Sequence, residues 1–409
     1  MKIRRIPLIA LPILCGATPT LAVDGVIEIN QVRALAGGVS SDTSSTDMPG
    51  FPVSILSAGS YRLTSNLEVP DENTTAIEVD VADVTIDLNG FVIQNATPCR
   101  PDCAPNGTGI GIDGNASENV AVTNGTVLGM GAEGVLLGAD AKVVGVRAMS
   151  NGSHGIVVGN SGMVRENTAA GNLARGIDVA LDGLVIDNVV RTSGTNGIVA
   201  QAGSSVRGNT VDGSGDTGIS VGATSVVSGN TIQNSVSHGI AAGLNTLVAD
   251  NVVRSAGVGA DGIRTGDSSL VRGNTSRDNG GSGISVGDDS AVIANVLHTN
   301  GLHGLEGDDN VGVLDNSIGD NVSAGAFING TALASRNSVH DNVAGIDALG
   351  FGSLFSDNSV SGNAGVGLFC GTNAGYGGSV FSGNNSGGSQ TSCTNEIDAN
   401  VCGSNTTCP

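Results

Sequence analysis

A glycine followed by an aliphatic residue recurs along most of this chain at a spacing close to 21 residues, with single steps of 23, 20 and 22. A period of about 20 residues is typical of a solenoid, because each unit buries its apolar face only against its neighbours. The glycine column comprises Gly134, Gly155, Gly176, Gly197, Gly218, Gly239, Gly262, Gly283, Gly304, Gly325, Gly345 and Gly367. Two asparagine columns share the period: Asn167, Asn188, Asn209, Asn230, Asn251, Asn274, Asn295, Asn316, Asn337 and Asn358, and less regularly Asn151, Asn172, Asn279, Asn300, Asn321, Asn342 and Asn363.

Within one unit the apolar residues alternate, as at Ile156 and Val158, with further single positions at Val164, Val185 and Val190. A period of two indicates strands. Three strands of three to five residues with tight corners fill 21 residues and leave no room for a helix. The sequence therefore predicts a parallel β-helix, in which each strand pairs with its equivalent one turn on, about 4.8 Å away.

The high glycine content, 65 of 409 residues, is explained by the same coil. We expect the asparagines to occupy the left-handed backbone of sharp corners and to hydrogen-bond to one another along the stack. We expect the glycines to serve other corners, where a side chain would be costly. Both asparagine columns are interpreted as scaffold and not as a binding row.

Three stretches near the N-terminus carry a family resemblance: Gly59 to Leu63, Val69-Pro70, and Val84-Thr85-Ile86-Asp87-Leu88-Asn89-Gly90. They resemble the first segment of secreted bacterial right-handed parallel β-helix proteins of the pectate-lyase-like superfamily, and the later units are similar to that family's repeats. The resemblance implies an all-β, right-handed parallel β-helix. It leaves function open, because the superfamily includes lyases, glycoside hydrolases, epimerases, tailspikes and adhesins.

The chain divides into four predicted segments: a signal peptide at residues 1–22, an N-terminal cap with the first coils at 23–106, β-helix repeats at 107–370, and a disulfide-pinned C-terminal cap at 371–409. The signal is read from basic Lys2, Arg4 and Arg5 followed by an apolar run and small residues up to Ala22. A lipoprotein anchored through Cys15 is the alternative. We therefore expect an exported protein, periplasmic, on the cell surface or extracellular, without a membrane span after cleavage.

Six cysteines remain after the predicted cleavage, in two groups near the ends of the mature chain: Cys99, Cys103, Cys370, Cys393, Cys402 and Cys408. In an exported protein this predicts disulfides that pin the ends. Free buried thiols are the alternative, and six cysteines allow fifteen pairings.

The formal net charge of −21 at pH 7 excludes nucleic acid and anionic lipid as partners, because both would be repelled. No glycine-rich phosphate loop with its lysine is present. The partner classes that remain are an acidic polysaccharide held through a bridging cation and another cell-surface polymer.

Asp267, Asp288 and Asp309 follow the same corner on three successive coils, with Asp289 and Asp308 beside them. Carboxylates stacked at about 5 Å repel one another unless a cation lies between them or one is protonated. These five residues are the candidate ligands of a Ca²⁺ ion, because hard oxygen ligands suit its flexible coordination. A solvated acidic corner on an acidic protein is the alternative.

The candidate catalytic residues share the same coils: Asp261, Arg264, Asp288, His303 and Glu306. Carboxylates one or two coils apart approach the separations used by glycoside hydrolases, and Arg264 or His303 could remove the proton α to a uronate carboxylate. The pattern departs from polygalacturonases and uronan epimerases: the Arg-x-Lys and Asp-Pro-His motifs are absent, and Lys142 is the only lysine of the mature chain.

No aromatic residue lies between Phe91 and Phe327, so the middle of the rod lacks flat platforms for sugar rings. Phe355 and Phe381 fall in an inward column and are predicted to be core. His298 and His340 share an outward column with arginines and are interpreted as surface. Two functions stay open: a non-catalytic surface, matrix or polymer-binding module, which we favour, and a lyase or hydrolase of acidic polysaccharide, assisted by Ca²⁺.

Overall fold

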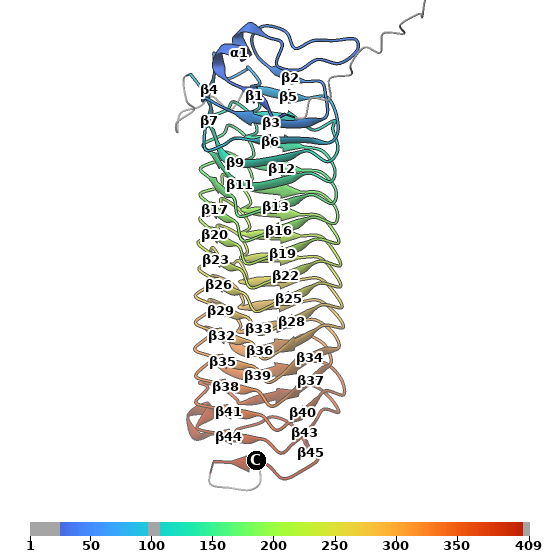
Figure 1. Ribbon diagram of the computed structural model, residues 1–409. Helices are drawn as coiled ribbons and strands as arrows, with labels where there is room; N and C mark the ends of the chain where they lie inside the picture. The colour runs from blue at the N-terminus through green and yellow to red at the C-terminus, as the bar shows by residue number, and fades with distance from the viewer. Residues whose placement is uncertain (1–24, 97–106, 404–409) are drawn as a thin grey trace, which may run out of the picture.

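The computed structural model describes residues 25–96 and 107–403, which form one elongated stack of coils (Figure 1). Its strands make two sheets, of 31 and 15 strands, that run along the stack. Equivalent strands of successive coils pair in parallel and in register, as Ile156–Val158 does with Ile177–Val179. These features confirm the predicted all-β parallel β-helix with coils of about 21 residues.

The fifteen-stranded sheet contributes one short strand per coil. Its strands are β2 (Val53–Ile55), β5 (Ile77–Val79), β8 (Ile112–Gly114), β10 (Val135–Leu137), β12 (Ile156–Val158), β15 (Ile177–Val179), β18 (Ile198–Ala200), β21 (Ile219–Val221), β24 (Ile240–Ala242), β27 (Ile263–Thr265), β30 (Ile284–Val286), β33 (Leu305–Gly307), β36 (Ala324–Ile328), β39 (Ala344–Ala348) and β42 (Leu368–Cys370).

The larger sheet consists of two series of strands, joined where β9 and β11 are long enough to span both. The first series is β1 (Ile27–Ile29), β3 (Gly59–Leu63), β6 (Val84–Asp87), β9 (Ala121–Leu128), β11 (Lys142–Met149), β13 (Met163–Arg165), β16 (Leu184–Ile186), β19 (Ser205–Arg207), β22 (Val226–Ser228), β25 (Leu247–Ala249), β28 (Leu270–Arg272), β31 (Ala291–Ile293), β34 (Val311–Leu314), β37 (Ala332–Ser335), β40 (Leu354–Ser356), β43 (Gly375–Gly377) and β45 (Asn395–Glu396). The second is β4 (Leu67–Val69), β7 (Val92–Asn95), β14 (Thr168–Ala170), β17 (Val189–Arg191), β20 (Thr210–Asp212), β23 (Thr231–Gln233), β26 (Val252–Arg254), β29 (Thr275–Arg277), β32 (Val296–His298), β35 (Ser317–Gly319), β38 (Ser338–His340), β41 (Ser359–Ser361), β44 (Val380–Ser382) and β46 (Val401–Cys402).

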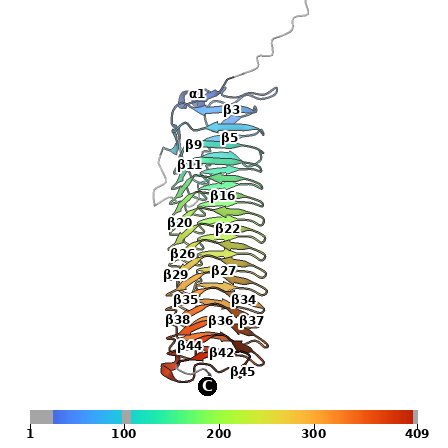
Figure 2. The same ribbon diagram turned by 60° about the horizontal axis from the view of Figure 1, so that its bottom comes forward.

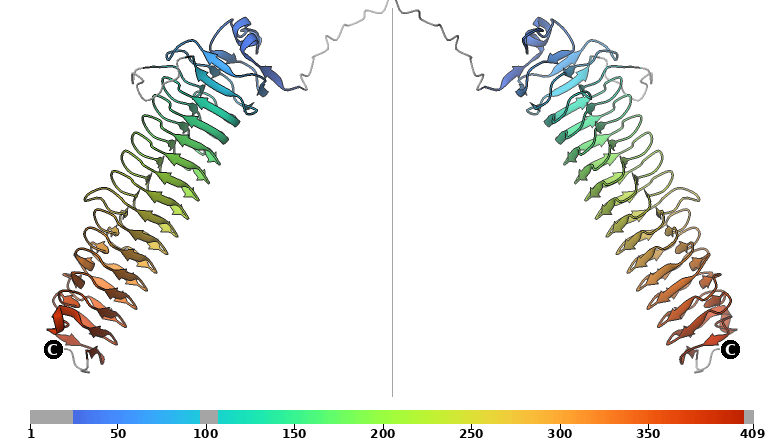
Figure 3. Two further views of the ribbon diagram at one scale, coloured as in Figure 1. Left: turned by 90° about the vertical axis from the view of Figure 1, so that its left-hand side faces the viewer. Right: turned by 90° about the vertical axis from the view of Figure 1, so that its right-hand side faces the viewer.

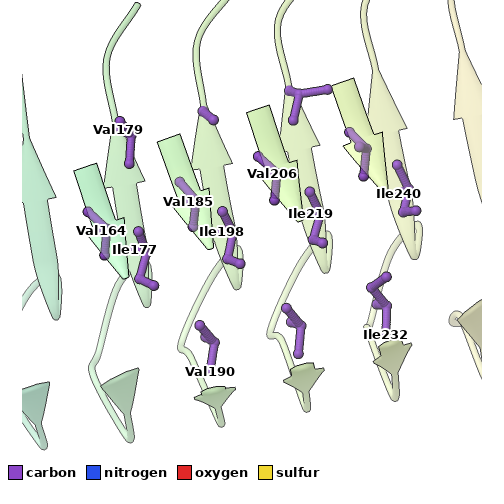
Figure 4. Packing of buried hydrophobic residues seen from close by; sticks show 14 of the residues in the cluster. Val164, Ile177, Val179, Val185, Val190, Ile198, Val206, Ile219, Ile232 and Ile240 are labelled. Carbon is purple, nitrogen blue, oxygen red and sulfur yellow. The ribbon is translucent and has the colours of Figure 1, made fainter. Parts of the chain in front are cut away.

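The core is a set of aliphatic columns that run along the inside of the coil (Figure 4). Ile177 and Val179 point inward from β15, Val185 from β16 and Val190 from β17, and all four are fully buried. The next coil repeats these positions with Ile198, Ala200, Val206 and Val211. Phe355 and Phe381 are buried as predicted, with exposed fractions of 0% and 1%.

The recurring glycines are required by close packing between coils, not by corner geometry. At Gly155 a Cβ atom would lie 2.6 Å from the carbonyl oxygen of Gly176, and at Gly176 it would lie 2.7 Å from that of Gly197. Neither glycine has a positive φ. These glycines do lie at bends directly before the strands, as expected, but a side chain is excluded there by the next coil and not by the backbone conformation.

The asparagine columns form ladders of hydrogen bonds, as predicted. Asn188 accepts two bonds from Asn167 through Oδ1, at 2.9 Å from the backbone N–H and 3.1 Å from Nδ2. Its own Nδ2 donates to Val164 O and to Asn209 Oδ1, both at 2.9 Å. The buried asparagines do not have the left-handed backbone we expected: the residue before each does, as at Glu166 and Asp187, with φ of 57° and 54°.

The less regular ladder is interrupted in the middle of the stack. Ser193, Ser214, Ser235 and Ala256 replace asparagine there, and the hydroxyls of the three serines are buried without a hydrogen bond. The ladder resumes at Asn279, which donates to Asn300. The coils between Ser193 and Ala256 therefore depend on a single complete asparagine ladder.

Helix α1 (Gln31–Ala36) lies at the N-terminal end of the stack, where Asn30 caps it by accepting the N–H of Arg33 at 3.0 Å (Figure 2). At the other end, β43 and β44 pair in register with β40 and β41, so regular coiling continues into the segment predicted as a cap. A short 3-10 helix, η1 (Asn384–Gly387), follows. Figure 3 shows the two ends far apart along the stack.

A disulfide joins Cys370 to Cys393, which confirms a disulfide at the C-terminal end, and Cys402 is also disulfide-bonded. Cys99, Cys103 and Cys408 lie outside the described residues, as does the predicted signal peptide at 1–22. Within residues 25–96 and 107–403, no helix has the length and apolar character needed to cross a membrane.

Candidate functional site

The candidate site lies on the outer face of the fifteen-stranded sheet. Each strand is three residues or slightly longer, and its inward positions are buried while one middle residue points outward. Because the strands pair in register, these outward residues form a straight column, the outward column. From β21 to β42 it reads Ser220, Ala241, Arg264, Ser285, Glu306, Phe327, Asp347 and Phe369.

A groove of about 540 Å³ opens around Arg264. The outward column is hollowed there because Ser220, Ala241 and Ser285 have short side chains, while the Arg264 side chain is long and exposed. His238 lines the groove as well, together with Asp267 and Asp308. In the part of the chain that the structure describes, Arg264 makes no ion pair.

Asp261 lies against His238 of the preceding coil. The Asp261 backbone N–H donates to His238 Nδ1 at 3.0 Å. Asp261 Oδ1 accepts the N–H of Ser282 at 2.9 Å. Burial raises the pKa of Asp261, and the Ser282 N–H and His238 oppose that shift.

Glu306 and His303 occupy the coil that follows. Ser282 is fully buried and donates its hydroxyl to Glu306 Oε2 at 2.9 Å. His303 Nδ1 accepts the N–H of Ala324 at 3.3 Å, and its ring stacks on Phe327 with centroids 4.8 Å apart and planes 14° apart. Burial lowers the pKa of His303, and Glu306 opposes this. Asp261 and His303 are thus both biased toward their neutral forms, a condition suited to proton transfer.

The stacked aspartates form a hydrogen-bonded ladder of their own. Asp267 Oδ1 accepts the N–H of Asp288 at 3.2 Å, Asp288 Oδ1 accepts that of Asp309 at 2.9 Å, and Asp309 Oδ1 accepts that of Thr331 at 2.7 Å. The Thr331 bonds lower the pKa of Asp309. Each carboxylate therefore has a structural role that does not depend on a bound ion.

Two further acidic residues complete this corner. Asp289 Oδ1 accepts the side-chain amide of Asn310 at 2.6 Å. The pKa of Asp308 is raised, first by burial and then by the charges of Asp288 and Glu306. In residues 25–96 and 107–403, no three Asp, Glu, His or Cys side chains converge in a way that could hold a metal ion. The Ca²⁺ site stays a prediction.

The structure brings the five candidate catalytic residues to one face but not to one point. Arg264 and Glu306 are two strands apart in the outward column, Asp261 and His303 precede their strands, and Asp288 follows its strand at the acidic corner. Asp261 and Glu306 approach each other through Ser282. Their catalytic roles stay predictions.

Four residues of this face were not among the candidate site residues chosen from the sequence: His238, Ser282, Phe327 and Asp347. The outward column was followed only as far as Glu306. Continuing it in register by two coils would have placed Phe327 and Asp347 beside the site. The aromatic gap therefore ends at the candidate site itself, and the site has an aromatic platform at its C-terminal side.

A second polar cluster lies on the same face nearer the N-terminus. Arg175 Nη1 contacts Asp178 Oδ2 at 2.5 Å, and His154 Nε2 lies 3.9 Å from the same oxygen. Ser153 Oγ donates to Glu133 Oε1 at 2.8 Å and lies 3.1 Å from His154 Nδ1. Burial lowers the pKa of His154. Here, unlike at Arg264, the arginine is neutralised by a carboxylate.

Asp347→Asn is expected to raise the thermal midpoint at neutral pH. Asp347 lies between Phe327 and Phe369 in the outward column, its carboxylate has no hydrogen bond or ion pair among the described residues, and burial raises its pKa. A folded-state pKa above the unfolded value means that stability falls as pH rises through the interval between the two. The gain should therefore vanish below pH 3.8, the ordinary pKa of an aspartate carboxyl.

Thermal melts of the parent protein and of Asp347→Asn, from neutral pH to below pH 3.8, test this expectation. Asp309→Asn is the contrasting control, because the pKa of Asp309 is lowered by its hydrogen bonds and its loss should not raise the midpoint at pH 7. A variant Asp347→Asn that melts at or below the parent protein at neutral pH would contradict the assignment of Asp347 as a destabilising carboxylate.

Comparison with known proteins gives two family models. The model described as "Right handed beta helix region" matches residues 217–364, and the one described as "Periplasmic copper-binding protein (NosD)" matches residues 82–255. The first model and the stacked coils fit a right-handed parallel β-helix, the fold that the sequence resemblance implied. No protein of curated function matches the sequence.

Three solved structures illustrate what this chain is similar to. The periplasmic alginate epimerase AlgG is 15% identical with a TM-score of 0.43, over 80% of this chain and 82% of its own. Pectate lyase Pel9A is 15% identical with a TM-score of 0.38, over 50% of this chain and 67% of its own. PfbA, a surface adhesin of Streptococcus pneumoniae, is 12% identical with a TM-score of 0.29, over 75% of this chain and 85% of its own.

Proposed function

We propose that this is an exported β-helix protein that binds an extended acidic polysaccharide along the outer face of the fifteen-stranded sheet, without cleaving it. The open groove around Arg264, which makes no ion pair among the described residues, carries the proposal. A guanidinium forms two parallel hydrogen bonds to a carboxylate, which suits the carboxylate of a uronate residue. Export is supported by the N-terminal signal pattern and by the match to a family described as periplasmic.

The aromatic platform supports a sugar ligand. Phe327 is stacked on His303 and partly exposed, and Phe369, two coils on, is 42% exposed. The two rings lie in one column with a spacing of two strands, about 10 Å. A polysaccharide that lies parallel to the rod axis would place sugar rings over both phenylalanines while a carboxylate reaches Arg264.

The acidic corner makes a bridging cation part of the proposal. Asp267 and Asp308 line the groove, and the pKa of Asp308 is raised by burial and then by the charges of Asp288, Glu306 and Asp267. An anionic polymer would be repelled by these carboxylates unless a cation lies between protein and polymer. Ca²⁺ suits this role because it accepts oxygen ligands in flexible geometry. We therefore propose that binding requires Ca²⁺.

Arg264→Ala is expected to weaken binding of polygalacturonate and alginate oligomers at least tenfold, since a hydrogen-bonded charged group contributes roughly 1.5–3 kcal/mol. Calorimetric titration of each oligomer into the protein, once with Ca²⁺ and once with EDTA, measures how far binding depends on Arg264 and on Ca²⁺. Arg272→Ala is the matched control, because Arg272 is exposed on the same coil but on the larger sheet. If Arg264→Ala binds as tightly as the parent protein, or if the parent binds neither polymer, the proposal fails. Equal binding in EDTA contradicts the Ca²⁺ requirement.

A second candidate function is cleavage of the same polymer. It is favoured because burial raises the pKa of Asp261 and lowers that of His303, which shifts both groups toward their neutral forms. The hydrogen bonds that connect Asp261 through Ser282 to Glu306 also favour it. Incubation with polyuronates, followed by absorbance of unsaturated product and by reducing ends, separates the two functions. Product that is lost in Glu306→Gln and Asp288→Ala would establish cleavage, and binding without product supports the module we favour.

A further inference from the structure

Two histidines approach each other on the larger sheet, on a different sheet from the polysaccharide site. His298 ends β32 and His340 ends β38, and the strand between them, β35, ends at Gly319 in the same register. Their ring centroids are 5.6 Å apart, although two strand spacings separate the backbones by about 10 Å. The two rings therefore lean toward each other across the intervening coil.

Gly319 makes this approach possible. A Cβ atom at residue 319 would lie 2.4 Å from His340 Cε1 and 2.9 Å from His298 Cε1. The backbone does not require glycine here, because the equivalent positions of other coils are Arg277 and Ser361, and φ is not positive. Glycine is therefore needed at residue 319 to leave room for the two histidine rings, and not for the backbone conformation of the coil.

Each ring is oriented by a carboxylate. His298 Nδ1 lies 3.5 Å from Asp320 Oδ2, and His340 Nδ1 lies 3.1 Å from Asp341 Oδ2. Both carboxylates contact Nδ1, so both Nε2 atoms are left for another partner. A carboxylate on one ring nitrogen is the usual outer partner of a metal-binding histidine, because it fixes the tautomer and increases the basicity of the other nitrogen.

The surroundings suit a cation that arrives from solvent. The histidine side chains are 29% and 30% exposed. The neighbouring Arg277 is neutralised by Asp278, whose Oδ2 lies 2.9 Å from Nη1. Asp320 and Asp341 therefore give the pair a negative environment.

We propose that His298 and His340 bind one divalent transition-metal ion through their Nε2 atoms, with water completing the coordination. Imidazole ligands select copper, zinc and nickel over calcium and magnesium, and Cu²⁺ binds most tightly among the first-row divalent ions. The pair lies beyond residues 82–255, so it is not among the residues that the NosD model matches. The site is independent of the polysaccharide groove.

Titration of the full chain with Cu²⁺, followed by calorimetry and by the nitrogen couplings in the electron paramagnetic resonance spectrum, tests the site. We expect one tightly bound Cu²⁺ ion with two nitrogen ligands. Zn²⁺ should compete with Cu²⁺ for this site, and Ca²⁺ should not. His298→Ala and His340→Ala should each lose the tight site. Gly319→Ala should weaken binding at least tenfold although both histidines remain.

Gly312→Ala is the matched control for Gly319→Ala. Gly312 lies in β34 of the same sheet, and a Cβ there would meet no atom closer than 3.9 Å. It should bind Cu²⁺ as the parent protein does. The proposal is overturned if the parent chain has no tight site, if either histidine variant keeps it, or if Gly319→Ala binds as tightly as Gly312→Ala while both fold.

Discussion

Replacing Asn251 by alanine is expected to lower the free energy of unfolding by about 4 kcal/mol. The side chain is fully buried and makes four hydrogen bonds. Its Oδ1 accepts the backbone N–H and Nδ2 of Asn230, both at 2.9 Å, and its Nδ2 donates to Val227 O and Asn274 Oδ1, both at 3.0 Å. Alanine would leave these partners buried without a bond, in coils where the second ladder is already interrupted.

Chemical denaturation of Asn251→Ala beside Asn329→Ala measures this effect. Asn329 is exposed, and its side chain makes no hydrogen bond among the described residues, so its removal should change stability little. Equal stability of the two variants would show that the ladder contributes far less than its hydrogen bonds indicate.

The double variant Cys370→Ser, Cys393→Ser is expected to lose about 3 kcal/mol of stability, because the disulfide closes a loop with a sequence separation of 23. The bridge ties β42 to the segment that follows the last regular coil. Without the bridge, that segment should detach first. The free edges of β42 and β44 would then be exposed and could pair with other chains.

Thermal melting and light scattering at several concentrations test both parts of this expectation. The parent protein under reducing conditions should melt at or below the midpoint of the double variant, because reductant also opens the disulfide of Cys402. A parent protein whose melting midpoint does not change on reduction would contradict a stabilising role of the bridge.

The coil was predictable from the sequence because each of its columns has one steric cause. Gly155 and its equivalents repeat since each faces a carbonyl oxygen of the next coil, and Val164 repeats since it points inward. The left-handed corners were not predictable: they fall on residues as different as Glu166, Ala294 and Arg336. At those corners the hydrogen bonds of the adjacent asparagine ladder hold the backbone in its left-handed conformation, whichever residue occupies the position.

The candidate site was predictable as a face but not as a set of contacts. Register alone places Arg264 and Glu306 in one column. Register also places His238 and Asp261 on consecutive coils, before Gly239 and Gly262, but it does not specify their contact, because the coil between them has 23 residues and protrudes at the exposed Val258. Side-chain contacts such as that of Ser282 with Glu306 depend on rotamers, which a spacing does not specify.

The asparagine ladders also give the rod an electrostatic polarity along its axis. In the main ladder each amide from Asn167 to Asn337 donates its Nδ2 to the Oδ1 of the next coil and accepts at its own Oδ1 from the previous one. Aligned amide dipoles add, so the C-terminal end of each ladder is the positive end. Beyond Asn358 the main column continues through Ser379 to Asn400, whose Nδ2 donates to the Glu396 carboxylate at 3.0 Å, and the other ladder ends on Gln390 Oε1. The two ends of the rod are therefore electrostatically distinct, and a negative charge terminates the positive one.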